Sequence, residues 1–368
     1  MKKLLFLVTE DGYFVSHRLP LAIAARAAGF EVVVATRIRE KAAAIAAAGI
    51  RVIPFEMDRR NMNPLRELPT LFRLWRLYRR ERPDIVHHVA LKPVLLGGLA
   101  ARLAGVRAVV GAVAGLGFLF SGRGRTPLAA RLVKGLLPGL IGQGRAIVQN
   151  PEDAAMLADC GVAASRIRLI RGAGVDTAWF TPAPEPPGIP LVVLPARMLR
   201  DKGVVEFVAA ARRLREQGVS ARFALVGAPD PANPASVSAA ELHAWAAAGA
   251  VECWGQREDM REVYAACHVV CLPSYREGLP KALLEAAACG RPIVATDAPG
   301  CREIVRDGDN GLLVPVRDAA ALAIALRRLL EDGELRRCMG ARGRELAVAA
   351  FSVEQVVSET LALYRELT

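Results

Sequence analysis

The chain has 368 residues, 53% of them hydrophobic, which is more than one domain needs and enough for two hydrophobic cores. Its seven cysteines are odd in number and show neither a CxxC pair nor zinc-ligand spacing, which argues against a disulfide scaffold and predicts reduced thiols in a cytoplasmic protein. The net charge of +12 is unevenly placed: residues 1–180 hold 27 Lys and Arg against 13 Asp and Glu, whereas residues 181–368 hold 22 against 24.

The chain begins with a short apolar run at residues 4–8, which ends at Thr9, Glu10 and Asp11. This run is too short for a signal peptide and predicts a buried strand. Charged residues interrupt every longer apolar stretch, so we expect no transmembrane span.

From this first strand to residue 170, short apolar runs alternate with helical patterns, as is typical of a parallel sheet flanked by helices. The predicted strands are residues 4–8, 31–36, 51–55, 84–89, 108–113, 145–149 and 168–170. The predicted helices are residues 17–28, 39–48, 65–81, 93–104, 126–137 and 151–160.

A proline-rich segment follows at residues 181–190 and predicts a linker between domains, because such a sequence continues neither a helix nor a central strand. The alternation then restarts with strands at 191–194, 222–226, 251–253, 268–272, 292–296 and 311–314, and helices at 203–217, 238–248, 258–266, 280–289 and 318–349. We therefore expect an α/β protein of two doubly wound domains, residues 1–180 and 191–350, with a ligand cleft at the carboxyl ends of their strands. A helix at about 352–368 is expected to pack back on the first domain.

The most informative segment, residues 272–296, runs from a strand through a glycine loop into a helix and a second strand. Glu277 lies in the loop and Glu285 in the helix, about 12 Å apart if helical rise applies throughout. Two carboxylates at that separation suit a sugar and a ribose at either end of a diphosphate. Gly278 lets the backbone approach a ligand, and the helix start offers N–H groups to an anion. Glutamates eight residues apart are also common in ordinary helices, so the spacing counts only in this context.

This segment resembles the E-x7-E signature of the retaining glycosyltransferases of family four, which have the GT-B fold of two Rossmann-like domains. Three further stretches are similar to the same family: residues 196–203 (Ala-Arg-Met-Leu-Arg-Asp-Lys-Gly), residues 174–182, and residues 298–314. The resemblance covers nearly the whole chain and is more specific in its second half.

The resemblance implies that the second domain binds a UDP-sugar. Arg197 and Lys202 are expected to bind the diphosphate and to stabilise charge on the leaving group. Glu285 is expected to accept hydrogen bonds from the ribose, and Glu277 to hold the donor sugar. No cofactor and no metal ion are expected, because cations and the helix dipole would take the place of a metal.

The backbone between the two glutamates is expected to contribute to the same site. Gly278, Leu279 and Pro280 open the helix, and the N–H groups of the first two are expected at the donor phosphate. The family's mechanism implies same-face displacement with retained configuration, in which the leaving diphosphate helps to deprotonate the acceptor.

In the first domain, residues 11–18 are predicted as a glycine-bearing loop, and the resemblance implies that Gly12 lies near the donor phosphate. His17 is either an acceptor-side residue or a helix cap. Adjacent strand residues point opposite ways, so at most one of His87 and His88 is expected to reach substrate, and we take His88, with Lys92 near it, as the acceptor candidate. Many relatives have a catalytic histidine after the next strand, but residues 111–117 here are Gly-Ala-Val-Ala-Gly-Leu-Gly, so no general base is identified.

The basic first half indicates an anionic partner. Residues 64–82 form an Arg-rich helical pattern with Phe72, Trp75 and Tyr78, which suits either a helix lying on an anionic bilayer or one packed on the sheet with a solvated basic face. Residues 117–125 are a second basic and aromatic candidate for membrane contact.

Residues 88–94, 115–117 and 226–236 resemble those of bacterial enzymes that extend sugars linked to undecaprenyl diphosphate. This resemblance implies transfer of an N-acetylhexosamine from a UDP-sugar to a lipid-linked saccharide in surface polysaccharide or glycoprotein glycan assembly. The first domain would bind that acceptor, and the protein would be peripherally associated with the inner face of the plasma membrane.

Two other functions remain open from the sequence. A nucleotide-sugar epimerase has a similar two-domain shape, but it needs acid–base groups at the sugar carbon that the glutamate segment does not suggest. The sequence pI of about 9.8 also suggests a nucleic-acid-binding protein, but no recognised nucleic-acid motif accompanies it, so we expect no nucleic-acid partner.

Overall fold

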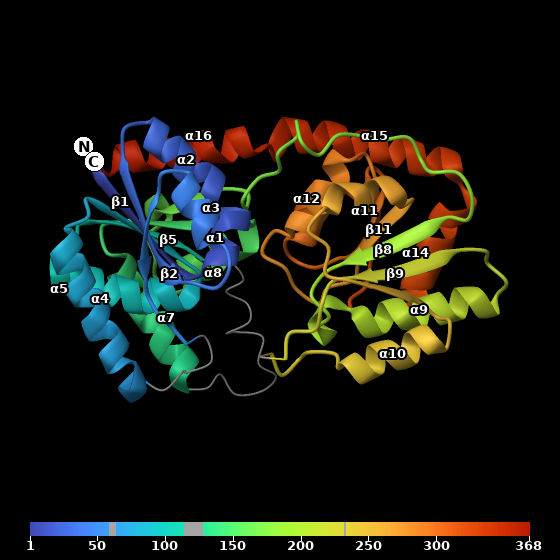
Figure 1. Cartoon of the computed structure of the whole chain (residues 1–368), viewed down its shortest axis with the longest axis horizontal. Helices are drawn as coiled ribbons and strands as arrows, with labels where there is room; N and C mark the ends of the chain where they lie inside the picture. The colour runs from blue at the N-terminus through green and yellow to red at the C-terminus, as the bar shows by residue number, and fades with distance from the viewer. Residues whose placement is uncertain (59–63, 114–127, 232) are drawn as a thin grey trace. The chain divides into compact units, whose positions relative to one another are not determined.

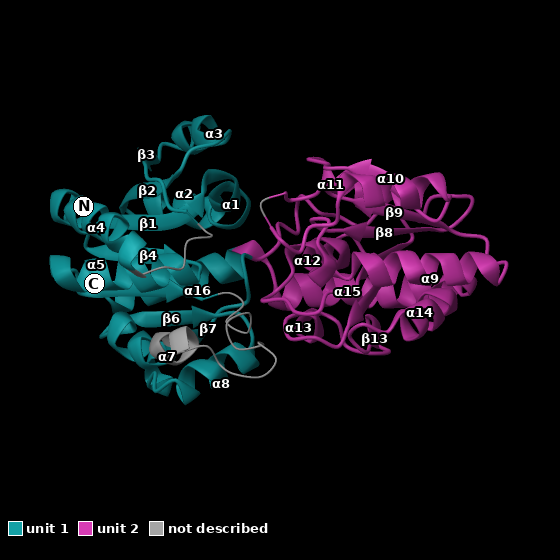
Figure 2. Cartoon of the chain, turned by 90° about the horizontal axis from the view of Figure 1, so that it is seen from below, with its two compact units in different colours: residues 1–173, 354–368 teal, residues 174–353 magenta. Residues whose placement is uncertain are grey.

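The computed structural model describes residues 1–58, 64–113, 128–231 and 233–368. The chain divides into two compact units (Figure 2). Unit 1 contains Met1–Ala173 and Glu354–Thr368, and unit 2 contains Gly174–Val353. Each unit is a parallel sheet with hydrophobic clusters on both faces, which confirms the predicted α/β fold class of two Rossmann-like domains.

Within the described residues, the sheet of unit 1 has seven strands in the order β3-β2-β1-β4-β5-β6-β7, all paired in parallel. Their bounds are β1 Lys3–Glu10, β2 Glu31–Arg37, β3 Arg51–Pro54, β4 Ile85–Val89, β5 Ala108–Ala112, β6 Arg145–Val148 and β7 Ile167–Leu169. The central strands are continuous apolar runs because helices cover both of their faces. The seven strands predicted from the first half of the sequence are all present, with bounds that agree within two residues.

The helices of unit 1 are α1 Asp11–His17, α2 Leu19–Ala27, α3 Ala42–Ala47, α4 Leu68–Glu81, α5 Gly98–Ala104, α7 Leu128–Ile141, α8 Pro151–Asp159 and α16 Val353–Glu366. The last of these comes from the far end of the chain, and Figure 1 shows it in red beside the blue elements of the N-terminal half. Val356, Leu363 and Tyr364 of α16 join the cluster built on Leu4 and Phe6 of β1. The C-terminal helix therefore completes the core of unit 1.

Residues 11–18 are not the predicted loop. Asp11–His17 form helix α1, and Gly12 is its second residue. The Asp11 carboxylate accepts hydrogen bonds from the backbone N–H groups of Gly12, Arg39 and Lys41. Of these N–H groups only that of Gly12 belongs to α1; the other two lie in the segment after β2, so Asp11 attaches the helix start to that segment, and its charge interacts favourably with the helix dipole.

Within the described residues, the sheet of unit 2 has six parallel strands in the order β10-β9-β8-β11-β12-β13. Their bounds are β8 Leu191–Pro195, β9 Arg222–Val226, β10 Glu252–Gly255, β11 Val269–Leu272, β12 Ile293–Thr296 and β13 Gly311–Val314. The helices are α9 Val204–Glu216, α10 Ala239–Ala247, α11 Met260–Ala266, α12 Lys281–Ala288, α13 Cys301–Ile304, α14 Ala319–Glu331 and α15 Gly333–Ala350. The strand order reverses between β8 and β11, and ligands of such sheets bind at the carboxyl ends of the strands beside that reversal.

The single helix predicted over residues 318–349 is two helices, α14 and α15, which are separated at Asp332. The Asp332 side chain accepts the backbone N–H of Leu335 and so caps the start of α15. An aspartate inside an apolar helical pattern was the available signal for this break.

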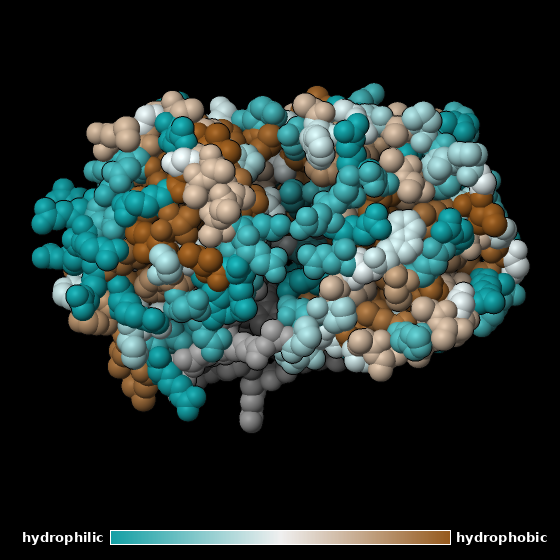
Figure 3. All heavy atoms as spheres, in the orientation of Figure 1, coloured by the Kyte–Doolittle hydropathy of each residue, from teal (hydrophilic) through white to brown (hydrophobic). Residues whose placement is uncertain are grey.

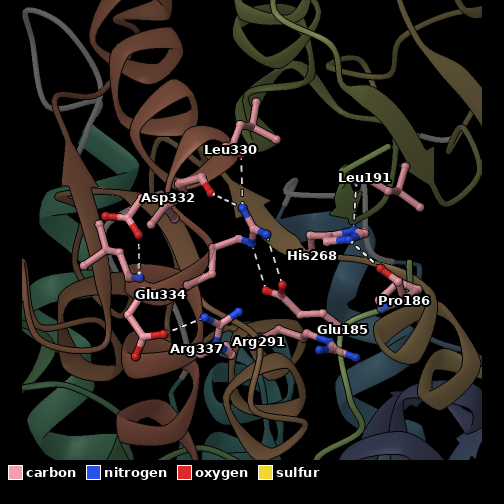
Figure 4. A network of polar contacts seen from close by, with 12 residues as sticks. Glu185, Pro186, Leu191, His268, Arg291, Leu330, Asp332, Glu334 and Arg337 are labelled. Atoms are coloured by element: carbon pink, nitrogen blue, oxygen red, sulfur yellow. Dashed lines mark hydrogen bonds and ion pairs between the residues drawn. The ribbon is translucent and has the colours of Figure 1, made fainter. Parts of the chain in front are cut away.

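The proline-rich segment belongs to unit 2, and the boundary between the units falls between Ala173 and Gly174, not at residues 181–190 as predicted. Arg336 holds Glu185 through two hydrogen bonds of 2.8 and 3.0 Å. Arg291 donates to the carbonyl of Pro184, and His268 contacts that of Pro186, as Figure 4 shows for part of this network. Prolines prevent regular structure here, but their carbonyls still accept hydrogen bonds, so the segment is attached to unit 2 by these contacts.

Candidate active site

The reversal in unit 2 brings together the turn that follows β8 and the loop that follows β11. Lys202 lies in that turn and Glu277 in that loop, and the Lys202 ammonium is 2.5 Å from Oε1 of Glu277. The Ser274 hydroxyl donates to the same oxygen at 2.7 Å. The structure therefore places two of the predicted site residues in direct contact, 75 residues apart in sequence.

Two glycines allow this close approach of backbone segments. Gly203 has a φ of +72°, and a Cβ at this position would lie 2.1 Å from the carbonyl oxygen of Pro273. Gly300 has a φ of +78°, and its Cβ would lie 2.4 Å from the carbonyl oxygen of Gly278. A side chain at either position would push the loop that carries Glu277 out of place.

Glu285 lies in α12 and is 7% exposed. Its carboxylate accepts a hydrogen bond of 3.0 Å from the Tyr264 hydroxyl, and Lys281 approaches it at 3.3 Å. Burial raises the pKa of Glu285, while Lys281 and Tyr264 act in the opposite direction. Helix α12 begins at Lys281 with Pro280 as its cap, so Glu285 lies just over one turn inside the helix.

Arg197 follows β8 but does not join the Lys202–Glu277 pair. Its guanidinium is 2.9 Å from Asp230, which lies beyond the end of β9, and its side chain is 56% exposed. Gly278, Leu279 and Pro280 form the connection between Glu277 and α12, as expected. These residues occupy the carboxyl edge of the sheet, where the predicted donor site was placed.

Unit 2 also has a hollow of about 330 Å³. Its lining comes from the end of β10 and from α11: Trp254, Arg257, Glu262, Val263 and Ala266. Val263 is the neighbour of Tyr264, which holds Glu285. Neither this hollow nor the roles of Ser274, Tyr264 and Lys281 were predicted from the sequence. Of these residues only Lys281 carries a sequence signal, because it is four residues from Glu285 in a helix.

In unit 1, Gly12 and His17 both lie in α1. A Cβ added at Gly12 would meet no atom within 4 Å, so the unit itself does not require a glycine there. The His17 ring stacks on Tyr13 with ring centres 4.1 Å apart, and its Nδ1 lies 2.6 Å from the Ser16 hydroxyl.

The prediction that His88 reaches the acceptor is wrong in this structure, because both His87 and His88 are fully buried. His88 contacts the Tyr78 hydroxyl at 3.0 Å, and His87 contacts the Tyr364 hydroxyl at 2.5 Å on the other face of the sheet. Burial lowers the pKa of His88 to about 3 and lowers that of His87 well below its ordinary value. Adjacent strand residues do point opposite ways, but here each face is covered by helices.

Lys92 forms an ion pair of 2.7 Å with Glu67 and also donates to the carbonyl of Asp58. Both side chains are mostly buried, with 15% of Lys92 and 9% of Glu67 exposed. Lys92 therefore fastens the start of α4 to the end of β4.

Residues 64–82 were predicted either to lie on a bilayer or to pack on the sheet with a solvated basic face, and helix α4 has features of both arrangements. Leu74, Leu77 and Tyr78 pack against the sheet, whereas Leu68 and Phe72 are more than half exposed among exposed arginines. Figure 3 shows hydrophobic side chains in brown at the start of α4, next to hydrophilic ones in teal. The second candidate, residues 117–125, lies outside the described residues, as do residues 115–117. Across the described ranges, no helix is long and apolar enough to cross a membrane.

In the part of the chain that the structure describes, no three His, Cys, Asp or Glu side chains gather in a way that could hold a metal ion. Asp307 and Asp309 are two residues apart in sequence, but their carboxylates do not form a metal site together. Asp307 accepts a hydrogen bond from the N–H of Leu313, and Asp309 forms an ion pair with Arg342.

Comparison with known proteins gives matches over both units. Residues 189–332 match the family described as "Glycosyl transferases group 1", and residues 3–140 match "Glycosyl transferase 4-like". An N,N'-diacetylbacillosaminyl-diphospho-undecaprenol alpha-1,3-N-acetylgalactosaminyltransferase of Campylobacter jejuni is 31% identical over 78% of this chain and 78% of its own length. A UDP-Gal:alpha-D-GlcNAc-diphosphoundecaprenol alpha-1,3-galactosyltransferase of Escherichia coli is 26% identical over 84% of this chain and 82% of its own.

A solved structure gives the same result for the fold. The Anabaena protein HepE, determined in complex with UDP and glucose, has a TM-score of 0.81 at 20% identity and covers 98% of this chain and 100% of its own. The relative from Campylobacter jejuni is similar enough in sequence, and over enough of both chains, to establish family membership. The chain belongs to the group 1, or family four, glycosyltransferases, which have the GT-B fold.

Proposed function

We propose that this glycosyltransferase moves an N-acetylhexosamine from a UDP-sugar to a saccharide linked to undecaprenyl diphosphate, with retained anomeric configuration and without a metal ion. The observation that carries the donor half of this proposal is the Lys202–Glu277 pair at the strand reversal of unit 2. The names of the two relatives that act on undecaprenyl-diphosphate sugars support the acceptor half.

In the proposed donor site, Lys202 leaves Glu277 and pairs with the diphosphate of the incoming UDP-sugar. Glu277, no longer occupied by the ammonium, accepts hydrogen bonds from hydroxyls of the donor sugar. Arg197 turns from Asp230 to the same diphosphate. Two cations placed where negative charge develops stabilise the departing diphosphate, which is the task a metal performs in other transferases.

Glu285 is proposed to bind the ribose. A buried carboxylate that already accepts one hydroxyl, that of Tyr264, provides the acceptor chemistry that ribose hydroxyls need. The hollow lined by Trp254 and Val263 is proposed to hold the base, since Val263 directly precedes Tyr264, whose hydroxyl contacts Glu285.

Unit 1 is proposed to bind the acceptor. Residues 1–180, which include all of its N-terminal part, carry the excess of positive charge, which suits a lipid diphosphate and an anionic membrane surface. Gly12 and His17 in α1 remain the proposed contacts, and Lys92 is proposed to act through its hold on α4. The exposed apolar and basic start of α4 is proposed to lie on the inner membrane surface.

The proposal is tested by incubating the full chain with individual UDP-sugars and an undecaprenyl-diphosphate-linked saccharide in the presence of EDTA. Mass spectrometry should detect one added sugar, and NMR of the product should show the anomeric configuration of the donor. Products that form only after a divalent metal is added, or that have the inverted configuration, contradict the proposal.

A further inference from the structure

Arg317 holds an unfavourable backbone conformation at the carboxyl edge of unit 2. It lies between β13 and α14 and has a φ of +64°, a left-handed value that glycine adopts freely and that arginine rarely does. Asp318, the next residue, caps α14 by accepting the N–H groups of Ala320 and Ala321. A non-glycine residue persists in such a conformation when its surroundings hold it there.

The side chain of Arg317 identifies those surroundings. Its guanidinium lies over the ring of Tyr275, 4.4 Å from the ring centre. The hydroxyl of Tyr275 in turn donates to Oε1 of Glu206 in the first turn of α9, at 2.6 Å. Oε2 of Glu206 is buried and has no hydrogen-bond partner in the described part of the chain, so Tyr275 is the contact that this carboxylate has. The connection before α14 and the first turn of α9 therefore both contact the side chain of Tyr275, which lies in the loop after β11.

Tyr275 is joined directly to the candidate donor site. Its backbone N–H donates to the carbonyl of Asp201 at 2.8 Å, and Asp201 precedes Lys202. Tyr275 also lies two residues before Glu277 in the same loop. A shift of the Tyr275 ring would therefore displace both members of the Lys202–Glu277 pair.

We propose that Arg317 is a positioning residue for catalysis: it clamps the ring of Tyr275 against Glu206 and thereby fixes Lys202 and Glu277. This inference rests on the donor site proposed above. The attraction between the guanidinium and the ring offsets the backbone strain, which a glycine at residue 317 would avoid. A purely structural role predicts that stability and activity fall together; a positioning role predicts that they separate.

The test is Arg317→Gly in the full-length enzyme, with Arg328→Ala, which removes an exposed cation of α14, as the matched control. Arg317→Gly should keep or raise the unfolding free energy, and it should lower kcat by about tenfold with little change in the KM for the UDP-sugar. Arg328→Ala should leave kcat unchanged. A wild-type kcat in Arg317→Gly would overturn the inference, as would a parallel loss of stability and kcat.

A double-substitution cycle tests the route through the ring. In a Tyr275→Leu background, Arg317→Gly should have no further effect on kcat, because the ring it clamps is absent. An equal loss in both backgrounds contradicts the clamp. Glu277→Gln separates this inference from the proposed function: if it keeps the wild-type kcat, the donor site itself is wrong, whereas an inactive Glu277→Gln with an unimpaired Arg317→Gly refutes only the role of Arg317.

Discussion

At Glu285, a carboxylate lies in the interior of unit 2 with Tyr264 and Lys281 as its partners, and burial raises its pKa above the ordinary value of 4.5. A raised pKa means that the folded protein holds a proton more tightly than the unfolded chain does. The unfolding free energy therefore falls as pH rises from about 4.5 through the raised pKa.

Glu285→Gln should stabilise the protein at pH 7.5 and reduce its affinity for UDP-sugars by about tenfold or more, because the neutral amide removes the buried charge and a charged hydrogen-bond acceptor. Thermal melts at pH 4 and pH 7.5, with titration calorimetry at pH 7.5, measure both effects. The stabilisation should vanish at pH 4, where the carboxyl is protonated in both states. Equal stabilisation at both pH values, or unchanged affinity, would refute the account of Glu285.

For single residues, the sequence indicated which ones lie in a site motif, but it did not indicate which residues contact them in the folded protein. Glu277 and Glu285 were predicted from their spacing between a strand, a glycine loop and a helix, and Lys202 from the resemblance of residues 196–203 to the family. Tyr264 lies 21 residues from Glu285 and meets it only through the packing of α11 on α12. His88 was misjudged because strand alternation tells which face a side chain takes, but not whether a helix covers that face.

Among the helices, α4 has the surface that is best suited to contact a membrane. Leu68 is 56% and Phe72 55% exposed, although Leu74 and Leu77 of the same helix are buried. An exposed apolar pair within an arginine-rich helix is suited to the headgroup region of an anionic bilayer.

Leu68→Glu combined with Phe72→Glu should lower the affinity for anionic phospholipid vesicles by at least about tenfold, since both apolar contacts are lost and two negative charges are added. Vesicle co-sedimentation at several salt concentrations measures this, and wild-type binding should weaken as salt increases. Ile324→Glu on α14, a residue 72% exposed in unit 2, is the matched control and should bind as the wild type does. Equal vesicle binding by the α4 variant and the control would exclude α4 as the membrane contact.

The elements themselves followed from the alternation of apolar runs and helical patterns. Two departures from the prediction have local causes: Asp11 starts α1 where a glycine suggested a loop, and Asp332 divides a helix that periodicity alone continues. In both places an aspartate side chain satisfies backbone N–H groups, an effect that depends on a single residue and not on a pattern.

For the molecule as a whole, the chain returns to its first unit at the end. The buried ring of Tyr364 on α16 packs against Phe30 and His87. Tyr364 and His87 are 277 residues apart in the sequence. This return of the C-terminal helix was predicted from the sequence, but the boundary between the units was predicted in the proline-rich segment. Proline content indicates where regular structure stops; it does not show that Arg336 and Arg291 attach the segment to unit 2.

Tyr364→Ala should lower the unfolding free energy of unit 1 by about 3–5 kcal/mol, because it removes a buried aromatic ring and its contact with His87. Hydrogen exchange should increase in β1 and β4 and stay unchanged in β8 and β11 of unit 2. Glu359→Ala, an exposed change on the same helix, should alter stability by less than about 0.5 kcal/mol. Faster exchange throughout both units would contradict the assignment of α16 to unit 1 alone.

The proposed sugar transfer depends on one donor site at the strand reversal of unit 2, and variants of the Lys202–Glu277 ion pair test that site most directly. The measurement is the initial rate of sugar transfer from the UDP-sugar in EDTA for Glu277→Gln and Lys202→Ala, with Glu331→Gln, from an exposed ion pair on α14, as the control. We predict that kcat/KM falls at least about a hundredfold in both site variants and is unchanged in the control. Wild-type rates in Glu277→Gln and Lys202→Ala would show that the pair is not the donor site.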